Sequence, residues 1–397
     1  MPNNAPTANR AAATEIESVP AAARHFATVL RAGRSRRKFP GASPGACYTR
    51  FAFPASFRMQ LTLVVPGLLD LAETAPAHAD IEGAAVARLL ATSPPPTSHD
   101  GAIGIACAAL GMVKQRDWPM APLLAAAAKL DPGDAYWLLA EPVNLLVGQL
   151  DVQLGAIVDD LSTAEAQALV ATMNAHFAGD GLRFVAATPA RWLIAAERAQ
   201  QLVTHPASDA IGAPIFPFLP DGPDAPRWRR WQSEMQMLLF AHPLAGEREQ
   251  QGRAAVNGVW LSGGGVRASA QAAPKLASLF ADSPLLGDLA RACGVTVAAA
   301  PRSLESWLAA GPASPSLVWL PAFGANDRAP ALAVLGRDWV APLSAALARS
   351  TALDVRIVIS GRGRALSFTP RRPSLAARWR ARIAPPTLSA QLAAAGR

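Results

Sequence analysis

The stretch Met59-Gln-Leu-Thr-Leu-Val-Val-Pro-Gly67 decides the fold class of this 397-residue chain. Its centre, 61–65, is a continuous, largely apolar run with one threonine, and it ends at Pro66-Gly67. Such a run is typical of a strand buried on both faces, as the strands of parallel sheets are. We therefore expect a parallel strand here and place the start of the globular domain at Met59.

Helical and strand patterns alternate along the rest of the chain. Helices are expected at 81–92, 103–113, 268–281, 283–292 and 338–350, and strands at 135–139, 143–147, 182–188, 256–261, 295–299, 317–320 and 355–359. This alternation predicts an α/β fold, with a mainly parallel sheet covered by helices on both faces. Glu141-Pro142 is expected to separate the first two of these strands.

Two further helices carry clear end signals. Ser162-Thr-Ala-Glu165 is a capping box, and the helix behind it is expected to lead into the strand at 182–188 as one step of the α/β repeat. Asp224 and Pro226 begin a helix over 225–242, whose apolar stripe ends at His242. A polar loop is expected at 243–255.

The charge is unevenly distributed. The net charge is +8, but residues 1–58 hold 9 Lys/Arg and 2 Asp/Glu, residues 354–397 hold 9 and 1, and residues 59–353 hold 19 and 26. The body is therefore mildly acidic, and nucleic-acid binding, which needs a basic face on the folded domain, is not expected. We predict a disordered basic extension at 1–58, one domain at 59–385 and a flexible tail at 386–397.

Cysteine usage and hydropathy suggest a cytoplasmic protein. The three cysteines, Cys47, Cys107 and Cys293, are widely spaced and form no CxxC motif, so neither a zinc site nor a disulfide framework is expected. The longest apolar stretches, such as 102–113, are too short to span a bilayer, and no membrane partner is expected. The composition calls for no cofactor.

The strongest local signal for chemistry is the strand that runs into Ser262-Gly-Gly-Gly265. Two interpretations are open: a tight turn that needs positive φ, or a loop whose Gly263, Gly264 and Gly265 N–H groups bind an anion. His242 is likewise either a packed histidine at a helix end or a site residue. The cluster Arg227, Arg229 and Arg230 is interpreted as a solvated helix face.

The segment 233–265 resembles a known family. His242-Pro243, Asn257 and Gly263-Gly-Gly265 resemble the His-Pro…Asn…Arg-Gly-x-Gly run of archaeal-type cofactor-independent phosphoglycerate mutases, and Trp260 adds an Asn-x-x-Trp spacing that a second group shares. They are more similar still to a proteobacterial group of phosphoglycerate-mutase-like, RpfE-type regulatory proteins. This resemblance implies an alkaline-phosphatase-like core, with two metal ions and a phosphorylated Ser or Thr in the active members. It also implies His242, Asn257, Gly263, Gly264 and Gly265 as residues that bind an anionic small molecule.

The chain departs from the mutase pattern where metal ligands are expected. Pro66-Gly67 stands where the first strand should end in Asp-Gly, and Ser262 takes the place of a substrate-facing Arg. Asp-His ligand pairs are absent from the sequence. We therefore predict no metal site and no catalytic residue, and a regulatory or ligand-binding protein that has lost metal-dependent catalysis.

Two alternatives stay open. One is an active cofactor-independent phosphoglycerate mutase, or a related phosphotransferase, that uses Asp70, His99, Asp100 and His242 as its metal set. The other is a module that binds a protein partner through its basic ends. The sequence favours the non-catalytic protein because phosphoryl transfer needs Asp and His ligands in number.

Overall fold

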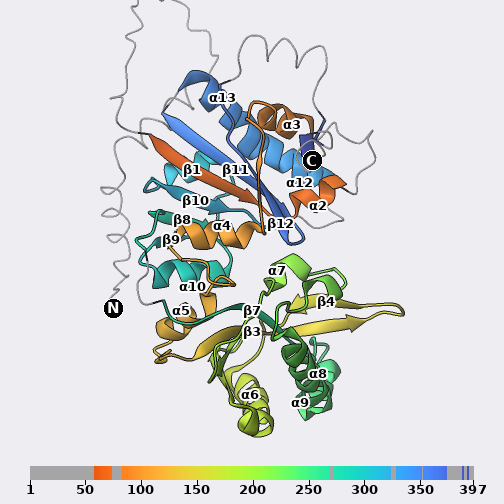
Figure 1. Ribbon diagram of the computed structural model, residues 1–397. Coiled ribbons are helices and arrows are strands. Elements are labelled where there is room, and N and C mark those ends of the chain that lie inside the picture. The colour runs from red at the N-terminus through yellow and green to blue at the C-terminus, as the bar shows by residue number, and fades with distance from the viewer. Residues whose placement is uncertain are drawn as a thin grey trace, which may run out of the picture.

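The computed structural model describes residues 58–73, 83–268, 272–322, 328–350, 352–372, 387–388 and 391–392. The predicted extension at 1–58, except Arg58, and most of the predicted tail at 386–397 lie outside the described residues. The described chain forms two sheets with helices around them (Figure 1). We call the first sheet with its helices the first lobe, and the second sheet with α6 to α9 the second lobe.

The first sheet is largely parallel, as predicted. Its seven strands follow the order β2-β12-β11-β1-β10-β8-β9. Strand β1 (Met59–Val65) lies at its centre, where it pairs in parallel with both β10 and β11, so the prediction from the opening apolar run is confirmed. Among the described strands of this sheet, β12 runs antiparallel to both of its neighbours, β11 and β2, and the remaining pairs are parallel. The other strands are β2 (Thr97–His99), β8 (Ser278–Ala281), β9 (Thr296–Ala298), β10 (Ser316–Trp319), β11 (Leu353–Gly361) and β12 (Arg364–Phe368).

Helices pack on both faces of this sheet. One face carries α2 (Leu68–Glu73), α3 (Ala84–Leu90), α11 (Leu304–Ala309), α12 (Arg328–Leu335) and α13 (Ala341–Arg349). The opposite face carries α4 (Ala102–Ala109) and α10 (Pro284–Ala292), while α5 (Met120–Ala127) packs between α10 and strands β3 and β7 of the second sheet. The cover on the α4 side is incomplete, because Gln60 and Arg356 are exposed on the strands below it.

One continuous helix, Ala329–Arg349, is long and apolar enough to cross a membrane by length and composition alone. A core helix of a globular domain passes the same test. Here its Leu332, Trp339 and Leu343 side chains are buried in the same cluster as Leu61 and Leu63 of β1. Burial against the sheet therefore accounts for the apolar character of this helix.

The second sheet corrects the predicted architecture, because its strand pairs are antiparallel. Strands β5 and β6 are separated by Pro189-Ala190 alone, and two residues can close a hairpin but cannot make the crossover that a parallel pair needs. The segments 182–188 and 256–261 therefore do not belong to the parallel sheet. The strands are β3 (Tyr136–Val147), β4 (Val152–Ile157), β5 (Leu182–Thr188), β6 (Arg191–Ala196) and β7 (Gly258–Gly265).

Strand β3 continues through Pro142, so the predicted break at Glu141-Pro142 is wrong. On one edge, β3 pairs with β6 up to Ala140 and with β4 from Val143 onward. Pro142 falls in the gap between those two partners, where the missing N–H removes no ladder hydrogen bond on that edge.

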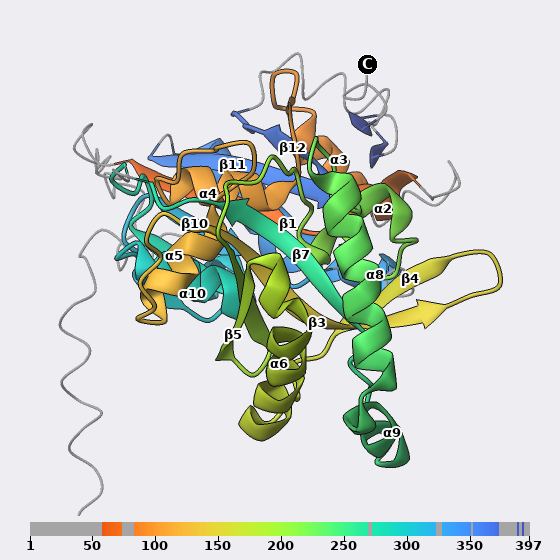
Figure 2. The ribbon, with the colours of Figure 1, turned by 60° about the horizontal axis from the view of Figure 1, so that its bottom comes forward.

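The helices of the second lobe follow the sequence signals closely. The capping box of Ser162 and Glu165 is formed at the start of α6 (Thr163–Phe177), and α8 (Ala225–Ala241) buries Trp228, Trp231 and Met235. Both helices pack on the face of the second sheet that points away from the first lobe (Figure 2).

Two secondary-structure predictions need further correction. The predicted loop at 243–255 contains α9 (Pro243–Gln250), which begins because Pro243 suits the first helical turn and His242 caps it. The last residues of the predicted helix at 268–281 form strand β8 instead. Leu279 and Phe280 are buried on opposite faces of the first sheet, and this packing overrides local propensity.

Candidate functional site

Two carboxylates lie at the carboxyl ends of the central parallel strands. After β1, Pro66-Gly67 turns the chain and α2 carries Asp70, whose Oδ1 accepts the Arg362 backbone N–H at 2.9 Å. Asp209 lies in the short helix α7 (Ala207–Ala210). Burial and then the charge of Asp70 raise the pKa of Asp209 to about 7. Asp70 and Asp209 therefore interact electrostatically at the edge where open α/β sheets usually bind ligands.

The side chains at this edge do not fit the two-metal centre that the mutase resemblance implies. Within the described ranges, no three His, Cys, Asp or Glu side chains form a group that could hold a metal ion. His99 Nε2 lies 2.9 Å from Ser367 Oγ on β12, Asp100 pairs with Lys114, and His242 lies in the second lobe. The proposed metal set of Asp70, His99, Asp100 and His242 is therefore not brought together, and no metal-dependent step follows from this geometry.

The glycine run is part of a strand. Gly263, Gly264 and Gly265 are the last three residues of β7 and are buried within the sheet, so they form no turn after the strand, although Gly263 has the positive φ that the turn interpretation required. A Cβ on Gly264 would lie 2.2 Å from the Tyr136 hydroxyl, and one on Gly265 would lie 2.6 Å from Cβ of Pro119. Close packing between β7 and its neighbours therefore explains both glycines. Gly263 has φ 64°, where β7 and β3 shift register.

The glycine N–H groups have acceptors inside the protein. The Gly263 N–H donates to Thr204 Oγ1 at 3.1 Å, and the Gly264 N–H donates to the Asp117 carboxylate. Asp117 also accepts from the Trp118 N–H at 2.7 Å and from the Thr204 N–H at 3.1 Å. Burial raises the pKa of Asp117, and these hydrogen bonds oppose that shift. An internal carboxylate thus takes the place that an external anion would need, although anion binding by these glycines stays a prediction.

Asn257 and His242 also make structural contacts. The Asn257 side chain accepts the Leu145 N–H at 2.6 Å and donates to the Leu145 carbonyl at 2.9 Å, which ties the chain before β7 to β3. His242 Nδ1 accepts the Leu244 N–H at 3.2 Å and so caps α9. Ser262 is buried inside β7 and does not reach a surface. A ligand-binding role for His242 and Asn257 stays a prediction.

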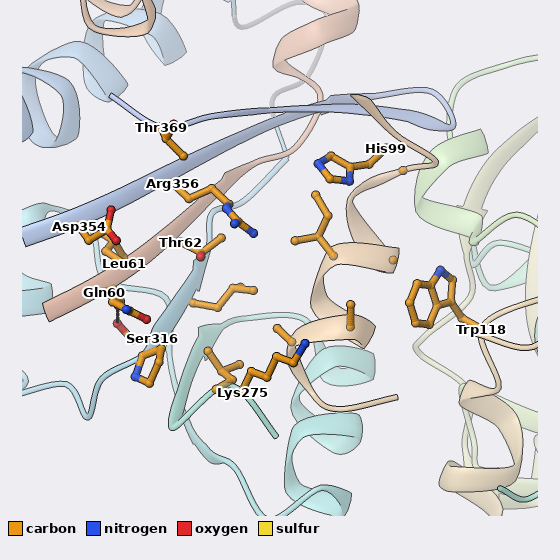
Figure 3. Close-up of a pocket in the computed structure, with 18 of the residues that line it drawn as sticks. Gln60, Leu61, Thr62, His99, Trp118, Lys275, Ser316, Asp354, Arg356 and Thr369 are labelled. Carbon is orange, nitrogen blue, oxygen red and sulfur yellow. Dashed lines mark hydrogen bonds between the residues drawn. The ribbon is translucent and has the colours of Figure 1, made fainter. Parts of the chain in front are cut away.

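A large cavity lies elsewhere in the structure. It has a volume of about 710 Å³ and lies over the amino-terminal halves of β1, β10 and β11, beside β2 and α4. Figure 3 shows the Arg356, His99 and Lys275 side chains reaching into it from different elements, with Trp118 at its far side. Burial, and then the charge of Arg356, lower the pKa of His99, while Asp100 opposes the shift.

Sequence reasoning missed most of this cavity, although one signal was present. Strand β11 reads Leu-Asp-Val-Arg-Ile-Val-Ile, with charges at Asp354 and Arg356 in an otherwise apolar central strand. Alternating charges at that position indicate one face that is not covered by a helix. No such signal indicated that Lys275 would line the same cavity, because this residue comes from a segment far away in the sequence.

The comparisons with known proteins bear on the fold alone. No family model matches this sequence, and no curated protein matches it. Two solved structures are similar to most of the chain. The cofactor-independent phosphoglycerate mutase of Thermoplasma acidophilum DSM 1728 is 15% identical, covers 80% of this chain and 91% of its own, and has a TM-score of 0.38.

The second structure is the PH0037 protein of Pyrococcus horikoshii. It is 14% identical, covers 80% of this chain and 88% of its own, and has a TM-score of 0.41. Since both TM-scores are below 0.5 and both identities are below 25%, neither likeness indicates an activity for this chain.

Proposed function

We propose that this chain is a phosphoglycerate-mutase-like protein that lacks metal-dependent catalysis and acts as a ligand-binding, regulatory protein of the cytoplasm. The observation that carries this proposal is the composition of the carboxyl edge of the first sheet. There, Pro66-Gly67 and Ser360-Gly361 occupy the strand ends, and the nearby carboxylates are Asp70 and Asp209.

The charge at this edge is too small for the chemistry of the mutases. Metal-assisted phosphoryl transfer uses divalent ions to neutralise the transferring group, and those ions are held by several carboxylates and imidazoles. With a pKa of about 7, Asp209 is about half protonated at neutral pH, so the pair carries less than two negative charges. Asp70 also gives one lone pair to the Arg362 N–H. These features support a binding role over turnover.

A second candidate function is an active mutase or related phosphotransferase. The observation in its favour is the carboxylate pair itself, because Asp70 and Asp209 lie at the ligand-binding edge of a parallel sheet. A divalent ion between them would lower the pKa of Asp209 by supplying positive charge. This alternative predicts a bound metal and turnover that depend on both carboxylates.

Metal analysis and a turnover assay separate the two candidates. The purified full-length chain is dialysed with Mn²⁺, its metal content is measured, and conversion of 3- to 2-phosphoglycerate is followed. We expect no stoichiometric metal and no turnover above a protein-free blank. Turnover that disappears in Asp70→Asn and in Asp209→Asn, but persists in the control variant Asp134→Asn at an exposed loop position, would overturn the proposal.

The regulatory role includes a protein partner, and the basic ends of the chain are its proposed contact. Residues 1–58 hold 9 Lys/Arg against 2 Asp/Glu. A pull-down that compares the whole chain with one lacking residues 1–58 tests this point. Retention of the same partners by the shortened chain would show that the basic extension is not the contact.

A further inference from the structure

We infer that the cavity over the amino-terminal halves of β1 and β11 binds a small molecule with two anionic groups, held by Arg356 and Lys275. The inference rests on the proposed function, because it locates the site where the ligand of that function would bind. It concerns the opposite end of the strands from Asp70 and Asp209, so its test reads binding and does not depend on whether that pair supports turnover.

The first argument is that a central part of the parallel sheet has no cover. Central strands of a parallel sheet are normally buried on both faces. On the α4 side, however, Gln60 of β1 and both Asp354 and Arg356 of β11 are exposed, whereas Val64 and Val358 on the same face are fully buried. These polar side chains therefore mark a part of the sheet that is open to solvent. The buried Val64 and Val358 mark the part of the same face that is covered.

The second argument is that two cations in this cavity have no partner. Among the described residues, neither the Arg356 guanidinium nor the Lys275 ammonium makes an ion pair or a side-chain hydrogen bond, whereas Lys114 pairs with Asp100 at 3.4 Å. No ion pair joins Arg356 to Asp354, two residues earlier on the same strand. The charge of Arg356 also reaches His99, because it helps to lower the pKa of that imidazole. An anion between Arg356 and Lys275 would satisfy both cations.

The third argument is the shape and lining of the cavity. A volume of about 710 Å³ lies within the range of small-molecule sites, which is roughly 300–1,000 Å³. The α4 wall is apolar, with Gly104, Ile105 and Ala108, and Trp118 adds an aromatic surface. Figure 3 shows the charged side chains entering from the sheet side and from the segment before β8. This combination suits an organic molecule that carries its charges at two ends.

Titration calorimetry at physiological salt tests the inference on the full-length chain. Pyrophosphate and citrate are the two probes, because one carries phosphate groups and the other carries carboxylates. We expect saturable binding of at least one probe, and the probe that binds assigns the anionic group. In Arg356→Gln and in Lys275→Gln, the dissociation constant should rise about tenfold, since each variant removes a charge-assisted contact.

Matched variants outside the cavity provide the control. Arg302→Gln and Lys129→Gln remove one exposed cation each, before α11 and after α5, and should bind the probe as the wild type does. All four side chains are exposed, so unchanged thermal midpoints should confirm that every variant folds. The inference is wrong if neither probe binds saturably in the millimolar range, or if both cavity variants bind as tightly as the two controls.

Discussion

Asp117 and Thr204 are joined twice, across 87 positions of sequence: Thr204 donates both its backbone N–H and its hydroxyl to Oδ2 of Asp117. Thr204 Oγ1 also accepts the Gly263 N–H at 3.1 Å. Asp117 lies between α4 and α5 of the first lobe, and Gly263 lies in β7 of the second. This buried network therefore connects the two lobes through one threonine.

Thr204→Val should lower the free energy of unfolding by about 2–3 kcal/mol, because it leaves the buried carboxylate short of a donor and the Gly263 N–H without an acceptor. The volume of the side chain hardly changes, so packing makes a small contribution. Urea denaturation followed by tryptophan fluorescence measures the change. Thr172→Val on α6, where the hydroxyl bonds only to the Ala168 carbonyl, is the matched control and should change stability little. Equal effects in the two variants would contradict a special role for the network.

Gly264→Ala should destabilise the protein by about 1–3 kcal/mol, because the added Cβ overpacks the buried sheet. That atom would lie 2.2 Å from the Tyr136 hydroxyl and 2.9 Å from Cδ2 of Leu138. Adding Tyr136→Phe to Gly264→Ala removes the nearest atom and should restore part of the loss. Gly246→Ala in α9, where nothing lies within 4 Å of the new Cβ, should cause no loss. Thermal melting of the four proteins decides the matter, and a harmless Gly264→Ala would count against close packing as the reason for this glycine.

Asp209→Asn should stabilise the protein at pH 8 and have little effect at pH 4. The folded pKa of Asp209, about 7, lies above its ordinary value of 3.8, so folding takes up a proton between these limits. The free energy of unfolding therefore falls as the pH rises from about 4 to 7, and the full penalty is present above pH 7. The amide removes this penalty, and because each pKa unit corresponds to about 1.4 kcal/mol, we expect a gain of about 3–4 kcal/mol at pH 8. Urea denaturation at both pH values measures it, and an equal gain at both would contradict the raised pKa.

Arg248 and Arg253 contact the same two carboxylates but should differ in their contribution to stability. The Arg248 side chain is 1% exposed and that of Arg253 is 30% exposed, and both bond to Asp160 and Glu165. Arg248→Gln should lower the free energy of unfolding by about 2–3 kcal/mol, because it removes the hydrogen bonds that the buried guanidinium donates to Asp160, Glu165 and the Ala254 carbonyl. Arg253→Gln should lower it by less than about 1 kcal/mol. Chemical denaturation of the two variants gives the comparison, and equal losses would contradict the dependence on burial.

The same network has a pH signature. Burial alone would raise the pKa of Glu165, but hydrogen bonds from Ser162, Arg248 and Arg253 outweigh it and lower the pKa to about 2. The stability that the ionised Glu165 carboxylate contributes is fully present above its ordinary pKa of 4.5. It is lost as the pH falls through about 2. In Arg248→Gln, the carboxyl resonance of Glu165 should titrate at a higher pH by NMR. An unshifted titration would show that Arg248 does not act on this carboxylate.

The sequence identified the elements whose signals are local. The run 61–65 predicted β1, because a largely buried strand is rich in apolar residues, and here only the half-buried Thr62 is polar. The capping box at Ser162 and Glu165 predicted the start of α6, and the stripe of Trp228, Trp231 and Met235 predicted the buried face of α8. Each of these patterns is set within a few residues of chain.

The candidate sites could be predicted only in part. His99 and Asp100 were named from the sequence, but as metal ligands, and the structure places them beside Arg356 and Lys114 on an uncovered face of the sheet. The Gly263-Gly-Gly265 run was recognised as unusual, yet its explanation lies in Tyr136, Pro119 and Met120, which are distant in sequence. Neither set of contacts could be predicted from the sequence, because contacts between distant residues produce no periodic pattern of apolar residues.

The sequence by itself determined which segments are buried and where several helices begin. Only the tertiary structure decided that 136–147 and 258–265 form an antiparallel second sheet, that Asp117 fills the space beside the glycines, and that Arg356 and Lys275 face one cavity. The physical reason is that the period of apolar residues records whether a face is buried, but not which distant strand or side chain covers it.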